Sequence, residues 1–228
     1  MIRTEIISRF REENPEMTAN VISDTVLKTW LLVGDKEVCA KARLIVASDT
    51  INATEDEDSY DLTVLDKFYD IDEYPGGGIY RVNTDGTGKR LVKTTKAELD
   101  ANNPSWRTAS SGIPKQYFRR GKYLKLDRDC SSSVDYFDVD YVAISDDFNS
   151  DSIIPYNQLP HLEPFHPALN FYLNWRAKVK VGKADEATTA LGLYSAYVLW
   201  MKKEVGGGKY GAVNYVPSGL PSSGSQRS

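Results

Sequence analysis

The spacing of apolar residues changes twice along this 228-residue chain, and this change constrains its fold more than any other feature. Up to about residue 47, and again after residue 160, apolar residues recur every three or four positions, as in an amphipathic helix. Between these segments they form short runs separated by Gly- and Pro-containing turns, which are typical of strands. The sequence predicts an α+β protein: a mainly α-helical bundle with a β-rich insertion between its N-terminal and C-terminal helix pairs, and an extended C-terminal tail.

The expected boundaries follow from this pattern. Residues 1–47 and 160–205 form the helical domain, residues 48–159 the β-rich insertion, and residues 206–228 a flexible C-terminal arm. In the first part, residues 2–13 form one helix, and a second helix starts at Ser23 as its N-cap. Gly34 is expected to kink or end the second helix, whose apolar stripe continues to Ile45. The polar stretch 48–59, with its acidic run 55–58, is interpreted as a solvated loop.

In the middle of the chain, residues typical of turns and of helix caps predict where strands and helices begin and end. Residues 85–88 are expected to form a hairpin turn, and the spacing of Thr95 and Glu98 predicts a capping box on a short helix. Residues 135–144 alternate apolar and acidic side chains, which predicts a strand with one core face. Asp138 and Asp140 lie on its other face and are the candidate acidic surface.

The C-terminal part predicts two helices and then a tail. His166 followed by Pro167 marks the start of one helix, and a long apolar stripe from Ala187 to Val205 marks the next. After Gly206-Gly207-Gly208 the tail still carries large side chains, which are depleted in segments that stay disordered. We expect these side chains to dock the tail on a neighbouring subunit or on a partner: Tyr210, Val213, Tyr215 and Val216.

Composition narrows the class of protein. The net charge of −4, from 32 acidic and 28 basic residues, argues against a domain that grips duplex DNA. No apolar run approaches the roughly 20 residues of a membrane-spanning helix, and the N-terminus lacks the order of a signal peptide. Cys39 and Cys130 are interpreted as reduced thiols in a cytosolic setting.

Three patterns resemble catalytic or ligand sites. His161 and His166 are separated by Pro164, which interrupts the helix that a HExxH-type zinc site uses. Gly86-Thr87-Gly88-Lys89 lacks the first glycine of a phosphate loop, because Asn83 occupies that position. A third pattern is a set of carboxylates that could serve a hydrolase: Asp135, Asp138, Asp140, Asp146 and Asp147. No histidine or nucleophile motif accompanies them, so we expect no metal, no cofactor and no enzymatic activity.

In the order of its elements and in several short segments, the chain resembles the head-tail adaptor (connector) proteins of tailed bacteriophages. The similarity covers nearly the whole sequence. It rests on the following segments: Ile6-Ile7-Ser8-Arg9-Phe10-Arg11, Trp30-Leu31, Tyr60-Asp61-Leu62, residues 91–100, Pro104-Ser105-Trp106, residues 112–117, Leu159-Pro160 and His166-Pro167-Ala168-Leu169. The chain departs from the family pattern in its longer acidic loop and in Gly76-Gly77-Gly78.

This resemblance implies a structural virion protein at the head-tail junction, which would be in the host cytoplasm while the virion assembles. It implies a homo-oligomeric ring, commonly a dodecamer, that binds the portal protein and the tail or nozzle proteins. Genomic DNA would pass an acidic lumen lined by Asp138 and Asp140 without sequence-specific binding, and no membrane would be involved. The alternatives are a carbohydrate- or protein-binding module of a tail appendage, and a carboxylate-based hydrolase.

Overall fold

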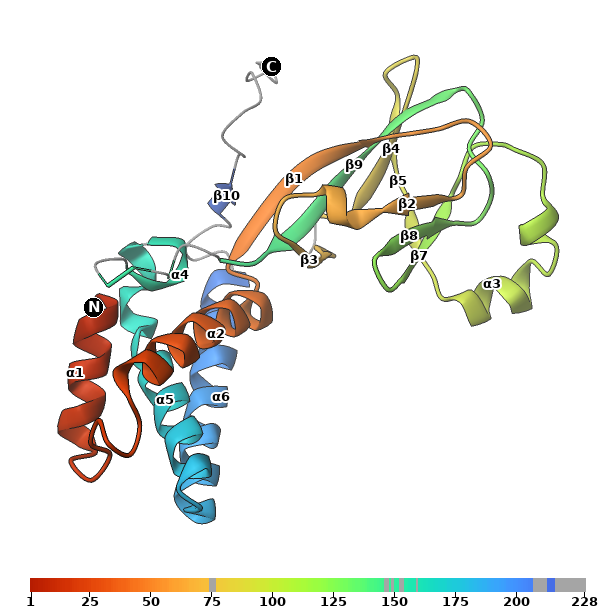
Figure 1. The fold of residues 1–228 in the computed structure, drawn as a ribbon. Helices are drawn as coiled ribbons and strands as arrows, with labels where there is room; N and C mark the ends of the chain where they lie inside the picture. The colour runs from red at the N-terminus through yellow and green to blue at the C-terminus, as the bar shows by residue number, and fades with distance from the viewer. Residues whose placement is uncertain are drawn as a thin grey trace. The chain divides into compact units, whose positions relative to one another are not determined.

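In the computed structural model, the chain folds as two compact units (Figure 1). The structure describes residues 1–73, 77–145, 148, 150–151, 154–158, 160–206 and 213–215. One unit consists of Met1–Val46 and Val142–Val213 and is helical. The other consists of Ala47–Tyr141, together with Asn214 and Tyr215 of the described tail, and is rich in strands.

The prediction of a mainly helical bundle is wrong. Of the described residues, 44% are helical and 24% lie in strands of two sheets, so the protein is an α+β fold. Part of the difference lies at β1 (Ile45–Asn52), where we expected the end of a helical stripe and then a loop. Arg43 adopts a left-handed conformation at the C-cap of the preceding helix, and the backbone beyond it is extended.

The helical unit is built from four longer helices: α1 (Arg3–Glu13), α2 (Asp24–Ala42), α5 (Pro167–Lys180) and α6 (Ala184–Gly206). Between α2 and α5 in sequence come α4 (Pro155–Gln158) and a 3₁₀ turn, η3 (Pro160–Phe165). The predicted N-cap of α2 is present, because Ser23 Oγ accepts a hydrogen bond from the Val26 backbone at 3.4 Å. α2 and α5 each pack against the other three longer helices, so these two helices form the centre of this unit.

Gly34 neither ends nor interrupts α2, which continues for eight residues beyond it. It lies where α2 crosses α5: a Cβ atom at Gly34 would be 2.8 Å from Cδ1 of Tyr172. The Tyr172 ring in turn packs edge-on against Trp175 and Tyr194, at centroid distances of 5.5 and 5.3 Å. The glycine therefore provides the close approach that lets an aromatic cluster join three helices.

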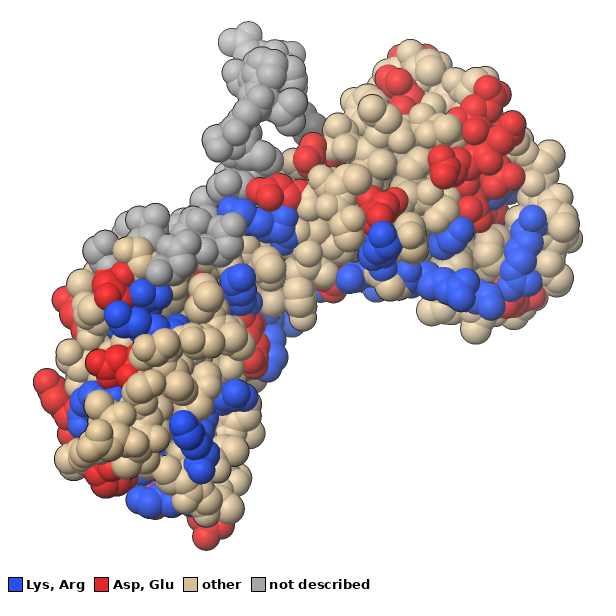
Figure 2. Space-filling view, in the orientation of Figure 1, with Lys and Arg blue, Asp and Glu red and all other residues tan. Residues whose placement is uncertain are grey.

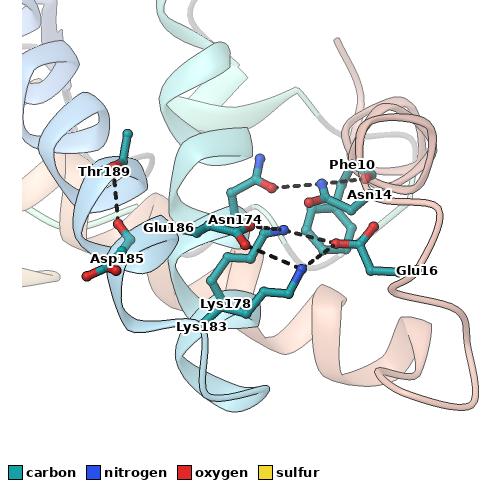
Figure 3. A network of polar contacts seen from close by, with 9 residues as sticks. All are labelled: Phe10, Asn14, Glu16, Asn174, Lys178, Lys183, Asp185, Glu186 and Thr189. Carbon is teal, nitrogen blue, oxygen red and sulfur yellow. Dashed lines mark hydrogen bonds and ion pairs between the residues drawn. The ribbon is translucent and has the colours of Figure 1, made fainter.

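A polar network joins the α1–α2 connection to α5 and α6 (Figure 3). Lys178, buried on α5, pairs with Glu16 at 3.0 Å and with Glu186 of α6 at 2.7 Å. Lys183 adds a contact of 3.3 Å to the same Glu16. A hydrogen bond from its own backbone, then those from the two lysines, lower the pKa of Glu16 to about 2.

The β-rich unit contains two sheets. The first has the order β10-β1-β9-β4-β5, with β3 (Phe68–Ile71) also paired to β9. Its other strands are β4 (Ile79–Asn83), β5 (Gly88–Arg90), β9 (Val134–Ala143) and β10 (Val213–Tyr215). The predicted hairpin turn is confirmed: β4 and β5 pair antiparallel, and Asn83 and Thr87 are joined by a backbone hydrogen bond of 3.0 Å.

The second sheet has the order β2-β8-β7-β6. It consists of β2 (Ser59–Asp61), β8 (Tyr123–Leu126), β7 (Gln116–Arg120) and β6 (Val92–Lys93). Two short 3₁₀ turns, η1 (Leu62–Val64) and η2 (Trp106–Thr108), and the helix α3 (Lys96–Asn102) complete the unit. The predicted capping box on α3 is confirmed, with Thr95 and Glu98 exchanging hydrogen bonds of 2.7 and 3.1 Å.

The core of the first sheet centres on β9. Phe137, Val139 and Tyr141 are fully buried, as the alternation predicted, and Tyr60 packs edge-on against Phe137 at 5.0 Å.

The described part of the chain contains no helix with the length and apolar character needed to span a bilayer.

The Gly34–Tyr172 contact gives a first prediction. Gly34→Ala should lower the free energy of unfolding by about 1–3 kcal/mol, because the added methyl must displace the Tyr172 ring. Gly192→Ala on α6 is the matched control, since a Cβ there meets no atom within 4 Å. It should raise the free energy of unfolding by up to about 1 kcal/mol through helix propensity. Urea denaturation measures both; equal effects of the two substitutions would contradict the packing account.

Candidate functional site

The predicted acidic face lies on β9, at the centre of the first sheet. Asp138 and Asp140 are half-buried rather than fully exposed. Asp138 accepts a hydrogen bond of 2.8 Å from the Ser48 hydroxyl on β1. The two carboxyls lie on the face opposite Phe137, Val139 and Tyr141, as the alternation predicts.

Partial burial makes the carboxyl of Asp140 a weaker acid than a free aspartate. Desolvation raises its pKa, and the nearby charges of Asp138 and Asp72 act in the same direction. The nearby Ser48 hydroxyl, which donates to Asp138, partly opposes this shift of the Asp140 pKa. The neighbouring carboxyl of Asp138 therefore disfavours the ionisation of Asp140.

The predicted docking residues of the tail fall at the edge of the described chain. Val213 and Tyr215 belong to β10, the end strand of the first sheet, next to β1. Tyr210 and Val216 lie outside the described residues, as do Asp146 and Asp147 of the carboxylate set. The tail anchors therefore remain a prediction.

Burial and hydrogen bonds determine the state of the histidine and cysteine residues considered as possible metal ligands. His166 stands at the N-cap of α5, but its side chain makes no capping hydrogen bond, and burial lowers its pKa to about 4. Burial also raises the pKa of Cys39, and raises that of Cys130 to about 11, so both thiols are protonated at neutral pH. Within the described residues, no three His, Cys, Asp or Glu side chains are arranged to hold a metal ion.

The second sheet and α3 enclose a surface that the sequence analysis missed, which we call the basic groove. It consists of two hollows of about 430 and 440 Å³ that share Lys96, Phe118 and Arg120. Alternation on β7 places Phe118 and Arg120 on one face, and Lys125 of β8 lies opposite Phe118 in the antiparallel register. The cationic side chains that line the groove are Lys93, Lys96, Arg107, Arg119, Arg120 and Lys125.

A small apolar cluster forms the floor of the groove. Leu99, Trp106 and Phe118 are buried together, with the two rings edge-to-face at 5.8 Å. Trp106 Nε1 donates a 2.8 Å hydrogen bond to Asp100, and Arg107 stacks over the Trp106 ring at 4.9 Å. The cationic side chains thus surround a cluster of packed apolar residues.

Most cations of the groove already have an anionic partner. Ion pairs join Arg107 to Asp100, Arg119 to Asp70, Lys125 to Asp58 and Lys93 to Glu73, at distances from 2.6 to 3.0 Å. Lys96 and Arg120 are exposed and make no ion pair or side-chain hydrogen bond within the described chain. These two side chains are therefore available to an external anion.

The signal for this groove was present in the sequence, but the whole-chain charge concealed it. Residues 88–128 contain eleven Lys and Arg and three Asp and Glu, a net charge of +8. Residues 49–73 contain ten Asp and Glu and one Lys, a net charge of −9. These two opposite charges nearly cancel, and together they contribute only −1 to the net charge of −4.

Four acidic residues of the segment 49–73 pair with cations of residues 88–128: Asp58, Asp61, Asp70 and Glu73. The remaining charges of the β-rich unit separate in Figure 2. Blue atoms gather along its lower edge, where Figure 1 places β7, β8 and α3. Red atoms gather at its upper end, where the chain turns from β1 to β2. The β-rich unit therefore has a basic pole and an acidic pole.

The helical unit carries a different kind of surface on α6, which we call the apolar strip. Leu193, Tyr197 and Trp200 follow each other at helical spacing on one side of α6, and Leu193 and Trp200 remain 44% and 45% exposed. Phe165 and Phe171 pack against Trp200 and Tyr197 at 4.8 and 5.3 Å. These contacts fix the two rings of the strip while leaving Trp200 half open to solvent.

No protein-family model and no curated protein matches this sequence.

The environment of Asp140 gives a second prediction. Changing both Asp138 and Asp140 to Asn should leave the fold intact, because Asn has the size of Asp and its side-chain oxygen can still accept the hydrogen bond from Ser48. Since the pKa of Asp140 is raised in the folded state, its contribution is fully present below the unfolded pKa and is lost as pH rises through the folded pKa. Asp140→Asn should therefore gain stability relative to the wild type as pH rises from about 4 to 7.

Asp61→Asn is the control with the opposite sign. Hydrogen bonds from Lys122 and Thr63 lower the pKa of Asp61 to about 2. Its contribution is present above the unfolded pKa and is lost as pH falls through the folded value, so this variant should be less stable than the wild type at neutral pH. Denaturation of the wild type, Asp140→Asn and Asp61→Asn from about pH 2 to pH 7 measures both pH dependences, because Asp61 titrates below about pH 4 and Asp140 above it. The same pH dependence in both variants would contradict the two pKa shifts.

Proposed function

We propose that this protein is a structural head-tail adaptor of a tailed bacteriophage, a subunit of a ring that joins the portal to the tail. The sequence resemblance suggests this function. The structural observation that carries it is the apolar strip on α6, because a helix exposing Leu193 and Trp200 beside its packed face is suited to a neighbouring subunit.

The composition of the strip supports a protein partner. Aromatic side chains are enriched in the cores of protein interfaces, and Trp is frequent among the residues that dominate binding energy. The rings of Tyr197 and Trp200 are already held by each other at 5.7 Å and by aromatic neighbours in η3 and α5. Little side-chain entropy is then lost when a partner covers them.

In the proposed ring, the face carrying Asp138 and Asp140 lines the DNA channel. Its half-buried carboxyls are held by β9 and by the Ser48 hydroxyl rather than on a mobile loop. An acidic wall lets DNA pass without binding it, because like charges keep the phosphates at a distance. The partners are the portal protein, the tail or nozzle proteins and further copies of this chain, in the virion.

Ring formation on the portal gives the third prediction. Mixed with the portal protein of the same genome, the chain should form a closed ring on it, while alone it should be largely monomeric. Leu193→Glu should abolish the ring without changing the thermal unfolding of the monomer, because the side chain is exposed. Ser195→Glu, exposed on the opposite side of α6, is the matched control and should assemble normally. Native mass spectrometry with and without the portal measures ring formation, and calorimetry measures the thermal unfolding of the monomer. A stable dimer that does not bind the portal would contradict the proposed function.

The tail gives the fourth prediction. Truncation after Gly208 removes Tyr210, Val213, Tyr215 and Val216, and from the described structure it removes the three-residue end strand β10. We expect weaker attachment to the portal and nearly unchanged thermal unfolding of the monomer. The measurements are co-sedimentation with the portal and calorimetry. A large loss of monomer stability with attachment intact would show that the tail belongs to the subunit's own core.

A further inference from the structure

We infer that the β-rich units of neighbouring copies dock head to tail, with the acidic turn of one copy in the basic groove of the next. The acidic turn is Glu55–Asp58, between β1 and β2. The inference rests on the proposed ring, and it adds a second contact between copies that is chemically distinct from the apolar strip.

The basic groove has the properties of a receptor for carboxylates. Lys96 and Arg120 are exposed, line both hollows, and have no ion-pair partner in the described part of the chain. Phe118 lines both hollows with them and is buried in the apolar cluster, so a packed residue accompanies the two cations. Two such cations can receive two carboxylates through charge-assisted hydrogen bonds.

The acidic turn has the complementary properties. Glu55, Asp56 and Glu57 are exposed, and the side chains of Glu55 and Glu57 make no hydrogen bond or ion pair to any described residue. Their carboxylates are therefore available to a neighbouring copy.

The backbone of the turn is held rigidly. Asp56 N donates to Cys130 O at 2.9 Å, and Cys130 N donates to Glu57 O at 3.0 Å. Asp56 has a φ of 61°, and its side chain accepts a hydrogen bond from Ser111. The buried Tyr60 also binds the turn, because its hydroxyl oxygen accepts from Thr54 N at 3.1 Å. A turn fixed in this way loses little entropy on docking.

The acidic turn and the basic groove are distinct surfaces of the β-rich unit that border each other at Asp58, which belongs to the turn and pairs with Lys125 of the groove at 3.0 Å. A contact between different surfaces of identical copies is heterologous, so each copy uses its turn on one neighbour and its groove on the other. Repetition of such a contact closes into a ring when the rotation between copies permits it. Charge complementarity would fix the orientation of successive copies during assembly.

A nucleic acid fits the groove less well. Asp58, Asp70, Asp100 and Glu73 lie among the cations and pair with four of them. A continuous phosphate backbone would meet these carboxylates, whereas a short acidic turn needs only the two unpaired cations. The rings of Trp106 and Phe118 are buried and offer no open face for stacking bases.

The test exchanges charges between the two surfaces. One variant carries Lys96→Glu and Arg120→Glu, and the other carries Glu55→Lys and Glu57→Lys. Each alone should associate at least about tenfold more weakly than the wild type, because it places like charges across the contact. An equimolar mixture should recover association, since each groove then meets a turn of opposite charge. The mixture also shows that the variants are folded.

Two measurements are needed: sedimentation of the chain alone at low ionic strength, and native mass spectrometry of the ring on the portal. Lys89→Glu with Lys115→Glu is the matched control, which makes the same charge change at exposed positions that do not line the groove. It should assemble like the wild type, and wild-type association should weaken with added salt.

The outcomes separate the inference from the proposed function. If both groove and turn variants assemble like the wild type on the portal, the inference is overturned and the adaptor function stands. If no protein forms a ring on the portal but the mixture regains self-association, the docking stands and the adaptor function fails. If the groove variant loses binding to a duplex DNA fragment while its rings are intact, the groove serves nucleic acid and the inference is overturned.

Discussion

The arrangement of the β-rich unit depends on the pairing of its first and last strands. β1 and β9 are neighbours in one sheet, although more than eighty residues separate them in sequence. An inserted unit is tolerated when its two ends lie close together, because the surrounding fold is then not forced apart. β9 is well suited to this role, since Phe137, Val139 and Tyr141 bury one face while β1, β3 and β4 all contribute to its sheet. The acidic turn, the second sheet, α3 and the strands β3, β4 and β5 of the first sheet all lie between these two strands in sequence.

Local signals predicted the elements whose stability is local. The Ser23 cap, the Thr95–Glu98 capping box and the hairpin between Asn83 and Thr87 each depend on hydrogen bonds within a few residues, and all three are present. β1 was missed because its partners are distant in sequence, and because Ser48, Asp49 and Thr50 interrupt its apolar pattern at Ile45–Asn52. Its buried positions still alternate at Ile45, Ala47 and Ile51. A strand of this kind is defined by the sheet that receives it rather than by its own sequence.

The candidate site was hidden for a related reason. The groove combines α3, β7 and β8 with Trp106 of η2, and a single helix or strand shows only one or two of its cations. Counting charge over the whole chain cancels the +8 of residues 88–128 against the acidic segments. Counting it in windows would have revealed the two poles, but not which cations are neutralised within the subunit. That distinction needs geometry: Arg107 and Lys125 are paired, whereas Lys96 and Arg120 are not paired within the described residues.

The two proposed contacts between copies differ in what each contributes to assembly: one contributes binding free energy and the other contributes orientation. The apolar strip on α6 gains free energy by removing Leu193 and Trp200 from water, a term that depends little on salt and carries little directional information. The charged contact contributes modest affinity, because both partners must lose hydration, but it selects orientation and accelerates encounter. A chain with only the strip would associate in several registers, and a chain with only the charged poles would dissociate at physiological salt. In the proposed assembly on a portal, the copies are held side by side, so both contacts would form at high effective concentration. Two individually weak contacts are then compatible with a monomer in solution and a closed ring on the template.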